Sequence, residues 1–239
     1  MGELDGKIAL VTGGSRGIGR AIAVALAREG AAVAGCSVRG PFDERGRARG
    51  GFLQDLADGG GRSFLAACDV RRADEVARFR DAVLAELGAP AVLVNNAGTV
   101  ARARFVDLSD EAFDEVMASN VRGTFLVTRA FLPAMLKKAG ARIINLSSIA
   151  GRQGTAMLAA YNAAKHAVVG LTRSLAEELR GQAVAVNAIC PGSVDTEMLQ
   201  IGMPGGKPSM TAEDVARVAL FLATDAPPAL TGSCVDVFG

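Results

Sequence analysis

A chain of 239 residues, half of them hydrophobic and with a net charge of +1, can bury one large core without metal ions or disulfide bonds. Its basic and acidic residues are interspersed, which argues against a nucleic-acid partner, and no apolar run reaches the ~18 residues of a membrane span. The four cysteines lack metal-ligand spacing, so we expect free thiols and no metal site. The segment 1–7 has no apolar leader pattern, so we expect a cytoplasmic protein.

Short apolar runs alternate with longer segments of helical periodicity along the chain, which predicts parallel strands joined by helices. We expect strands over residues 7–12, 31–38, 63–67, 91–94, 142–146, 183–189 and 234–237. We expect helices over residues 16–29, 71–87, 110–138, 159–179 and 212–224, and an irregular Gly- and Arg-rich loop over 40–51. The expected fold is α/β: a single Rossmann-type domain over residues 1–239, with a doubly wound parallel sheet of seven strands and helices on both faces.

The carboxyl ends of the predicted strands mark where a site is expected. Right-handed crossovers place these ends on one edge of the sheet, and ligands of such folds bind in the crevice outside that edge. The residues at the predicted ends are Thr12, Ser37, Asp69, Asn95, Ser147 and Pro191.

Three glycines lie in the turn between the first predicted strand and helix. Gly13 supplies the backbone conformation of a sharp turn, Gly17 lets the backbone approach a pyrophosphate, and Gly19 lets the helix pack close to the sheet. The free N–H groups and the dipole of the helix favour phosphate. The pattern indicates a dinucleotide site, with a tight turn that binds no ligand as the alternative. Further residues of this turn expected to contact the cofactor are Ser15, Arg16 and Ile18.

The end of the second predicted strand bears on the choice between NAD and NADP. An NAD site usually has an acidic residue there to hold the ribose hydroxyls, whereas this segment reads Cys36-Ser37-Val38-Arg39. Arg39 and Arg16 offer two guanidinium groups to a 2′-phosphate. We therefore expect NADP(H) to be preferred over NAD(H), the alternative being that both arginines are solvated surface residues. Asp69 and Val70 are expected to flank the adenine.

Tyr161 is the one tyrosine of the chain, and Lys165 follows four residues later on the same predicted helix. Residues i and i+4 share a helical face, so the ammonium group would lie near the phenol. With the positive nicotinamide ring of an oxidised cofactor, it would lower the phenol pKa toward the operating pH. Ser148 could hydrogen-bond a substrate oxygen, and Asn120 could hold a water that relays protons to Lys165. Such a Tyr-Lys pair is also common by chance, as part of an ordinary amphipathic face.

The order and spacing of these motifs resemble those of the classical short-chain dehydrogenases/reductases over essentially the whole chain. The matching residues are Thr12-Gly13-x-x-x-Gly17-x-Gly19, Asp69-Val70, Asn95-Asn96-Ala97-Gly98, Asn120, Ser148, Tyr161-x-x-x-Lys165 and Pro191-Gly192 followed by Thr196. Within the family, KIALVTGGSRGIGRAIA and VNAICPG look most similar to the bacterial 3-oxoacyl-acyl-carrier-protein reductases of fatty acid biosynthesis.

The resemblance implies a catalytic tetrad of Asn120, Ser148, Tyr161 and Lys165, in which Lys165 also holds the nicotinamide ribose. It also implies cofactor contacts by Asn96, Ala97, Gly98, Pro191, Gly192, Val194 and Thr196. It implies a homotetramer (or homodimer) whose dimer interface uses the helices expected at 110–138 and 159–179. The implied reaction is the reduction of a small-molecule carbonyl to a secondary alcohol, with 3-oxoacyl thioesters as the leading substrate class.

Departures from the family pattern bear on the substrate. Ala139 follows Lys137-Lys138 where relatives often have an arginine, and Gln182 takes the place of a second docking arginine, so an acyl carrier protein is less expected than a small-molecule partner. The lid segment 197–210 is short and rich in Gly, Pro and Met, which favours an open or mobile site. The alternatives are a dehydrogenase of another alcohol (sugar, steroid, polyketide or xenobiotic) and a non-catalytic dinucleotide sensor.

Overall fold

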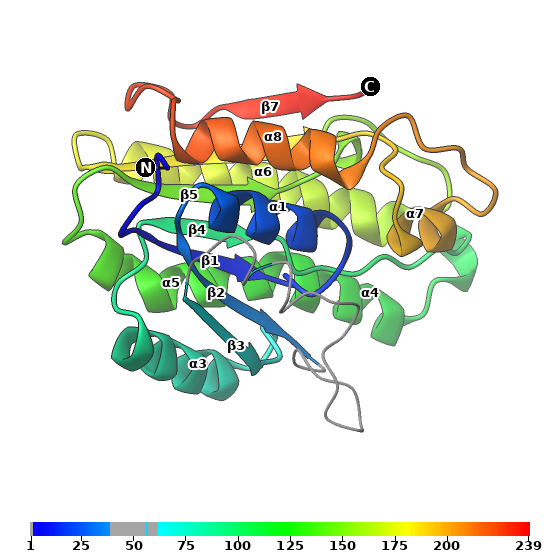
Figure 1. Ribbon diagram of the computed structural model, residues 1–239. Helices are drawn as coiled ribbons and strands as arrows, with labels where there is room; N and C mark the ends of the chain where they lie inside the picture. Colours follow the sequence, from blue (N-terminus) through cyan, green and yellow to red (C-terminus); the bar gives the residue numbers. More distant parts are fainter. Residues whose placement is uncertain (1, 39–55, 57–61) are drawn as a thin grey trace.

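The structure is a computed structural model that describes residues 2–38, 56 and 62–239. Its centre is a seven-stranded sheet with the order β3-β2-β1-β4-β5-β6-β7, in which every neighbouring pair is parallel (Figure 1). The strands are β1 (Ile8–Thr12), β2 (Ala32–Ser37), β3 (Ser63–Ala67), β4 (Val92–Asn95), β5 (Ala141–Leu146), β6 (Val184–Pro191) and β7 (Cys234–Val237). The predicted α/β sheet is confirmed, and its strand order reverses between β1 and β4, where doubly wound folds bind their ligands.

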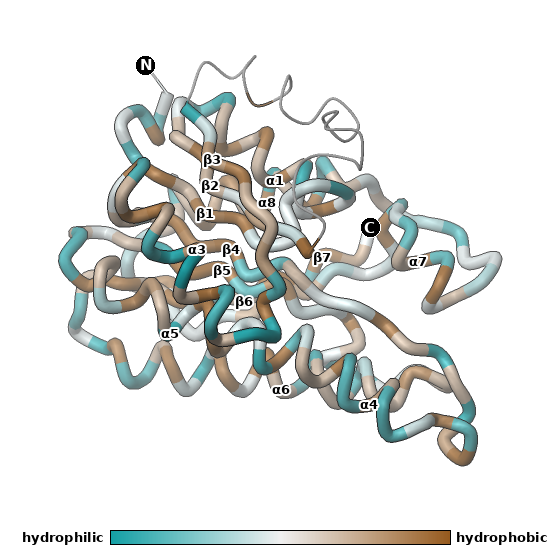
Figure 2. Tube along the Cα trace, turned by 90° about the horizontal axis from the view of Figure 1, so that it is seen from below, coloured by the Kyte–Doolittle hydropathy of each residue, from teal (hydrophilic) through white to brown (hydrophobic). Residues whose placement is uncertain are grey.

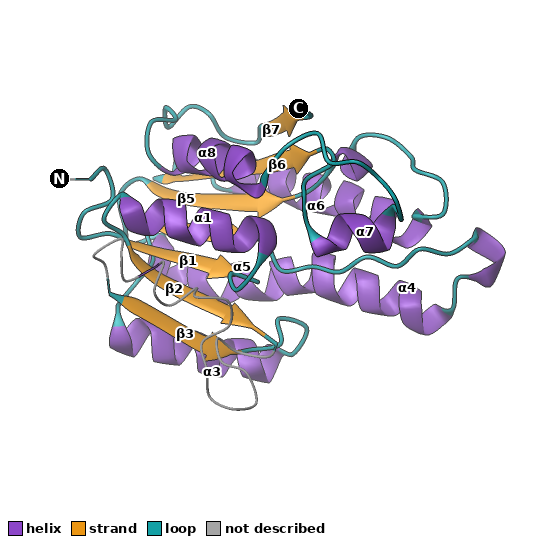
Figure 3. Ribbon diagram, turned by 45° about the vertical axis from the view of Figure 1, so that its right-hand side comes forward, coloured by secondary structure: helices purple, strands orange, loops and turns teal. Residues whose placement is uncertain are grey.

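Helices cover both faces of the sheet (Figures 1 and 3). One face packs against α1 (Gly17–Arg28) and α8 (Ala212–Ala223), and the other against α3 (Ala73–Glu86), α5 (Gly123–Met135) and α6 (Ala159–Glu178). Two shorter helices, α4 (Asp110–Met117) and α7 (Glu197–Gly202), lie toward the carboxyl ends of the strands (Figure 3).

The sheet separates two apolar cores, and Figure 2 shows the hydrophobic colouring that runs along its central strands. Leu26 of α1 and Val215 of α8 are fully buried in one core. In the other core, the rings of Phe79 and Phe131 meet edge to face, with centroids 6.0 Å apart. Because strands buried on both faces need apolar residues throughout, the continuous apolar runs of the sequence were a sound basis for predicting them.

The helical pattern predicted over residues 110–138 is confirmed over 110–135, but the helix is not a regular α-helix throughout. The segment forms α4, a π-helical turn over Ala118–Arg122, and then α5. In the π turn, the side chain of Asn120 donates to the carbonyls of Thr99 and Val116, and the Thr124 hydroxyl donates to the carbonyl of Asn120. These side-chain bonds replace part of the regular helical ladder, and π turns of this kind are frequent at functional sites.

The segment expected to be an open or mobile lid contains a helix, α7, that the sequence analysis missed. Thr196 caps it by accepting a hydrogen bond from the N–H of Leu199 at 3.3 Å. The expected loop over 40–51 and Arg39 lie outside the described residues. The four cysteines are free thiols, as expected, and three of them are buried. Among the described residues, no helix is long and apolar enough to cross a membrane.

Candidate active site

A cavity of about 120 Å³ lies at the carboxyl end of the sheet, between the strand ends and α7. Ser148 and Tyr161 form part of one wall. Val194, Thr196 and Met198 contribute from the segment that follows β6. The lining therefore brings together residues that are far apart in the sequence, such as Ser148 and Met198, which are 50 positions apart, as expected for a site outside the strand ends.

The glycine turn is braced by the segment after β4. The Thr12 hydroxyl accepts from the N–H groups of Asn96 and Ala97, both at 3.0 Å, and the Asn96 amide donates to the carbonyls of Thr12 and Gly13. A Cβ at Gly19 would lie 2.3 Å from Nδ2 of Asn96, so no larger residue fits there. Gly13 (φ 64°) adopts the left-handed backbone conformation that favours glycine. The predicted roles of Gly13 and Gly19 in turn geometry agree with these contacts.

Helix α1 begins at this turn without a side-chain cap on its first N–H groups. Those donors and the helix dipole are suited to a phosphate. The residue at the cap position, Arg16, forms an exposed ion pair with Glu197 at the start of α7. A Cβ at Gly17 would lie 3.4 Å from Cγ2 of Thr196, so the glycine turn and the start of α7 are in close contact.

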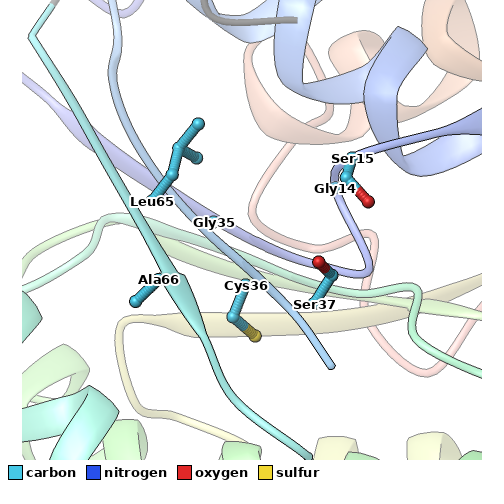
Figure 4. A pocket seen from close by; sticks show the side chains of 7 residues that line it. All are labelled: Gly14, Ser15, Gly35, Cys36, Ser37, Leu65 and Ala66. Carbon is cyan, nitrogen blue, oxygen red and sulfur yellow. The ribbon is translucent and has the colours of Figure 1, made fainter. Parts of the chain in front are cut away.

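Ser15 of the glycine turn and Ser37 at the end of β2 lie on either side of a small pocket of about 10 Å³ (Figure 4). No carboxylate is among the residues that line this pocket in the described part of the chain. The nearby carboxylate of Asp69 is held by the Arg71 guanidinium at 2.6–2.9 Å, which lowers the pKa of Asp69. The side chain of Val70 is buried against Gly123.

Tyr161 and Lys165 share the inner face of α6, as predicted from their spacing. Nζ of Lys165 lies 5.5 Å from the centre of the Tyr161 ring and donates to the carbonyl of Leu146 at 2.8 Å. Oη of Tyr161 lies 4.0 Å from Sδ of Met198, a residue that the sequence analysis did not single out. The Ser148 hydroxyl is next to the phenol and accepts from the N–H of Ala150 at 3.1 Å.

Burial dominates the electrostatics of this pair. It raises the pKa of Tyr161 to about 12, an effect that the Ser148 hydroxyl partly offsets. It also lowers the pKa of Lys165 to about 8. The prediction that Lys165 and an oxidised nicotinamide ring together lower the phenol pKa concerns the cofactor-bound protein and stays a prediction. In the protein by itself, desolvation of the phenolate outweighs the effect of an ammonium group that burial also disfavours.

Asn120 lies in the π turn, with its side chain buried. Its Nδ2 donates to the carbonyls of Thr99 and Val116, at 2.8 and 2.9 Å, while Oδ1 has no hydrogen-bond partner among the described residues. A Cβ at Gly98 would lie 2.3 Å from that Oδ1, so Gly98 is needed for the amide to fit. The predicted residues Gly98 and Asn120 are thus in direct contact.

A buried amide network beneath the site was missed by the sequence analysis. Asn95 donates to Asn145 at 2.8 Å and to Thr128 at 2.9 Å, and Asn145 donates to Thr172 at 2.9 Å. These bonds tie β4 and β5 to α5 and α6. Two asparagines at paired positions of adjacent apolar strands were the available signal, since a buried amide needs partners.

The sequence and the fold agree with known oxidoreductases. The pattern of the short chain dehydrogenase family matches residues 7–202. The chain is 36% identical to the 3-oxoacyl-acyl-carrier-protein reductase FabG of Pseudomonas aeruginosa, over 99% of this chain and 98% of the other. It is 35% identical to 2-(S)-hydroxypropyl-CoM dehydrogenase 3 of Xanthobacter autotrophicus, over 99% and 97%. The crystal structure of levodione reductase superposes with a TM-score of 0.88 at 26% identity, covering 98% of this chain and 96% of the other.

The sheet order, the glycine turn and the relatives define an oxidoreductase of the Rossmann type. The chain belongs to the short-chain dehydrogenase/reductase family, and the predicted resemblance to that family is confirmed. Within it, the chain is close in sequence to 3-oxoacyl-acyl-carrier-protein reductases, as predicted.

Proposed function

We propose that the protein is an NADP(H)-dependent reductase that converts a carbonyl to a secondary alcohol, with 3-oxoacyl thioesters as the leading substrate class. The observation that carries the proposal is the placement of Tyr161 and Ser148 on the wall of the cavity, with Lys165 buried directly behind the phenol. The relatives that reduce or oxidise such groups, by their names, support the reaction class.

The glycine turn fits a dinucleotide. A Cβ at Gly13 or Gly19 would press on the segment after β4, and the uncapped start of α1 offers N–H groups to a pyrophosphate. A bound nicotinamide would supply the hydride. We propose that the residues holding the cofactor are Gly13, Ser15, Arg16, Gly17, Ile18, Gly19, Arg39, Asp69, Val70, Asn96, Ala97, Gly98, Tyr161, Lys165, Pro191, Gly192, Val194 and Thr196.

The side chains of the tetrad divide the proton chemistry. The hydroxyls of Tyr161 and Ser148 donate hydrogen bonds to the carbonyl oxygen and thereby polarise it. Tyr161, protonated at neutral pH because its pKa is about 12, gives its proton to that oxygen as the alcohol forms. Lys165 returns a proton to the phenol, supplied through a water held at Asn120.

The preference for NADP(H) is supported by the end of β2. Ser37 is at the position where a carboxylate would hold the ribose hydroxyls of NAD, and Ser15 faces it across the small pocket (Figure 4). Arg16 lies in the glycine turn beside this pocket. An anionic 2′-phosphate at the end of β2 would therefore meet hydroxyls, with the Arg16 guanidinium nearby, and the described residues that line the small pocket include no carboxylate to repel it.

We also propose a cytoplasmic homotetramer (or homodimer). Phe113 of α4 and Phe125 of α5 are 40% and 45% exposed, so the helices that the family resemblance assigns to the dimer interface offer apolar side chains for such a contact. An acyl carrier protein is a less favoured partner, because Ala139 and Gln182 replace the expected docking arginines.

The test is NADPH oxidation with acetoacetyl-CoA, longer 3-oxoacyl thioesters, simple ketones and diketones, in the wild type and in Tyr161→Phe. We expect thioester turnover that falls at least ~100-fold in the variant, since a general acid is lost. Turnover of ketones but not thioesters would show that the substrate belongs to another class of carbonyl compounds. The absence of Tyr161-dependent turnover on the whole panel, in both reaction directions, would contradict the proposal and favour the dinucleotide sensor.

A further inference from the structure

Arg102, in the loop after β4, contacts two segments beside the cavity. Its Nη1 donates to the carbonyl of Gly202, the last residue of α7, at 3.0 Å. Its Nη2 donates to Sδ of Met157 at 3.1 Å. Gly202 lines the cavity, and so does Leu158, the neighbour of Met157. The guanidinium therefore lies between the two segments that frame the opening.

The charge of Arg102 is not neutralised by a carboxylate in the described part of the chain, because both acceptors are uncharged and a thioether is a weak one. Other arginines around the site differ in this respect. Arg16 is paired with Glu197, Arg104 with Asp107, and Arg152 with Asp236. The described residues that line the cavity carry no charged side chain. Arg102 thus adds a positive charge at the rim of an uncharged cavity.

Helix α7 contacts both the reacting phenol and Arg102. Met198, near the start of the helix, is in contact with Oη of Tyr161. Gly202, which binds Arg102, is four residues further on, about 6 Å along the helix axis. The phenol and the guanidinium thus contact the same helix about one turn apart, which favours a substrate whose anionic group is a few bonds from its carbonyl.

The backbone holds the rim in a fixed shape. Met157 has a φ of 66°, in the left-handed region that side chains other than glycine rarely adopt. Its carbonyl accepts from the N–H of Ala103 at 3.0 Å, next to Arg102. Strained conformations persist where the surroundings hold them, and they cluster at functional sites. The contact between these two loops keeps the guanidinium beside the opening.

We propose that Arg102 is a specificity-determining residue that recognises an anionic oxygen group, a carboxylate or a sulfonate, a few bonds from the substrate carbonyl. The inference rests on the proposed carbonyl reduction and narrows its substrate class to compounds that carry such an anionic group on one side of the carbonyl. The other side of the carbonyl can be a free chain or can end in a thioester. A guanidinium binds such groups through charge-assisted, often bidentate hydrogen bonds. The neutral acceptors that it now contacts compete only weakly.

The test compares methyl-ketone acids of increasing chain length (acetoacetate, 4-oxopentanoate, 5-oxohexanoate) with their uncharged methyl esters. The readout is the ratio of kcat/KM for each acid to that for its ester, in the wild type, Arg102→Met and Arg102→Lys. Arg104→Met is the matched control, since Arg104 is in the same loop but is paired with Asp107. We expect the wild type to favour one acid, Arg102→Met to lower that ratio at least about tenfold, Arg102→Lys to keep part of it, and the control to leave it unchanged.

A role of Arg102 in merely holding α7 predicts a different result, in which acid and ester lose activity together and the ratio stays constant. That outcome would overturn the proposal. Binding of the favoured acid, measured by thermal shift with NADPH present, separates this inference from the proposed function. If no ketone is reduced but binding of the acid depends on Arg102, the reaction is wrong and the anion recognition stands. If the acid binds equally well to Arg102→Met, the anion recognition is wrong.

Discussion

Nζ of Lys165 lies 5.5 Å from the centre of the Tyr161 ring, and burial moves the pKa values of the two side chains in opposite directions. Both shifts favour the uncharged form, since the phenol pKa rises to about 12 and the lysine pKa falls to about 8. A phenol that keeps its proton at neutral pH is ready to donate it, which suits carbonyl reduction. A lysine with a pKa near 8 exchanges its proton near neutral pH and can replace the one that the phenol gives away.

The lowered pKa of Lys165 predicts that the stability of the protein depends on pH. Between pH 8 and 10.5 the folded lysine binds fewer protons than the unfolded one, so the free energy of unfolding rises with pH through that window. This rise in the free energy of unfolding amounts to about 3 kcal/mol over the whole window. It is lost again as the pH falls to about 8. Tyr161 acts in the opposite sense only above about pH 10, where the unfolded phenol ionises first.

The matched variant for this prediction is Lys165→Met, which keeps the shape of the side chain and removes the charge. We expect Lys165→Met to be more stable than the wild type in urea unfolding at about pH 7, and this advantage to shrink by about 3 kcal/mol by about pH 10. A difference between the two proteins that does not change with pH would show that burial does not shift the lysine.

The ion pair of Arg16 with Glu197 predicts a specific effect on cofactor choice. If Arg16 contacts the 2′-phosphate, Arg16→Gln should weaken NADPH binding about tenfold and NADH binding much less. Glu197→Gln should instead strengthen NADPH binding a few-fold, because an exposed pair is worth at most about 1 kcal/mol and its loss frees the guanidinium. Fluorescence titrations with both cofactors measure this, and equal changes for NADPH and NADH would contradict the assignment.

Gly19 has no room for a side chain. A Cβ there would lie 2.3 Å from Nδ2 of Asn96 and 2.4 Å from the carbonyl oxygen of Gly13, and a backbone oxygen cannot move aside. We expect Gly19→Ala to weaken dinucleotide binding at least about tenfold by displacing the turn. Gly154→Ala is the control, because the space around Gly154 is open. Normal cofactor affinity of Gly19→Ala in a calorimetric titration would show that the turn is not part of the binding site.

The exposed Phe125 on α5 tests the proposed assembly. Placing a charge in an apolar contact between subunits is costly, so Phe125→Asp should lower the molar mass in light scattering from that of a tetramer or dimer. Phe105→Asp serves as the control, since Phe105 is 80% exposed outside the helices proposed for the interface. An unchanged mass for Phe125→Asp would place the interface elsewhere.

The sequence was sufficient to predict the sheet and the position of the site because both depend on local patterns. The apolar runs identify strands buried on both faces, and parallel strands must end on one edge. The spacing of Tyr161 and Lys165 gave their common helical face. The ends of β3 and β7 agree with the prediction to the residue.

The features that the sequence did not predict depend on contacts between distant segments. The π turn at Asn120 is maintained by the carbonyl of Thr99, 21 residues away, and periodicity does not reveal such a bond. Helix α7 has only 6 residues, less than two turns, and is held by its Thr196 cap and its contacts with the glycine turn. The pKa of Tyr161 depends on burial, which residue spacing does not determine.

The most direct test of the central claim is the transfer of deuterium from NADPH labelled at C4 of the nicotinamide, on either face, to a reducible carbonyl substrate in a single turnover. We predict deuterium at the carbinol carbon of the alcohol from one of the two labelled cofactors, and a rate at least ~100-fold lower in Tyr161→Phe with cofactor affinity retained. An alcohol without deuterium from either labelled cofactor, or a Tyr161→Phe variant that reacts at the wild-type rate, would contradict the proposal that Tyr161 donates the proton in a hydride-transfer reaction.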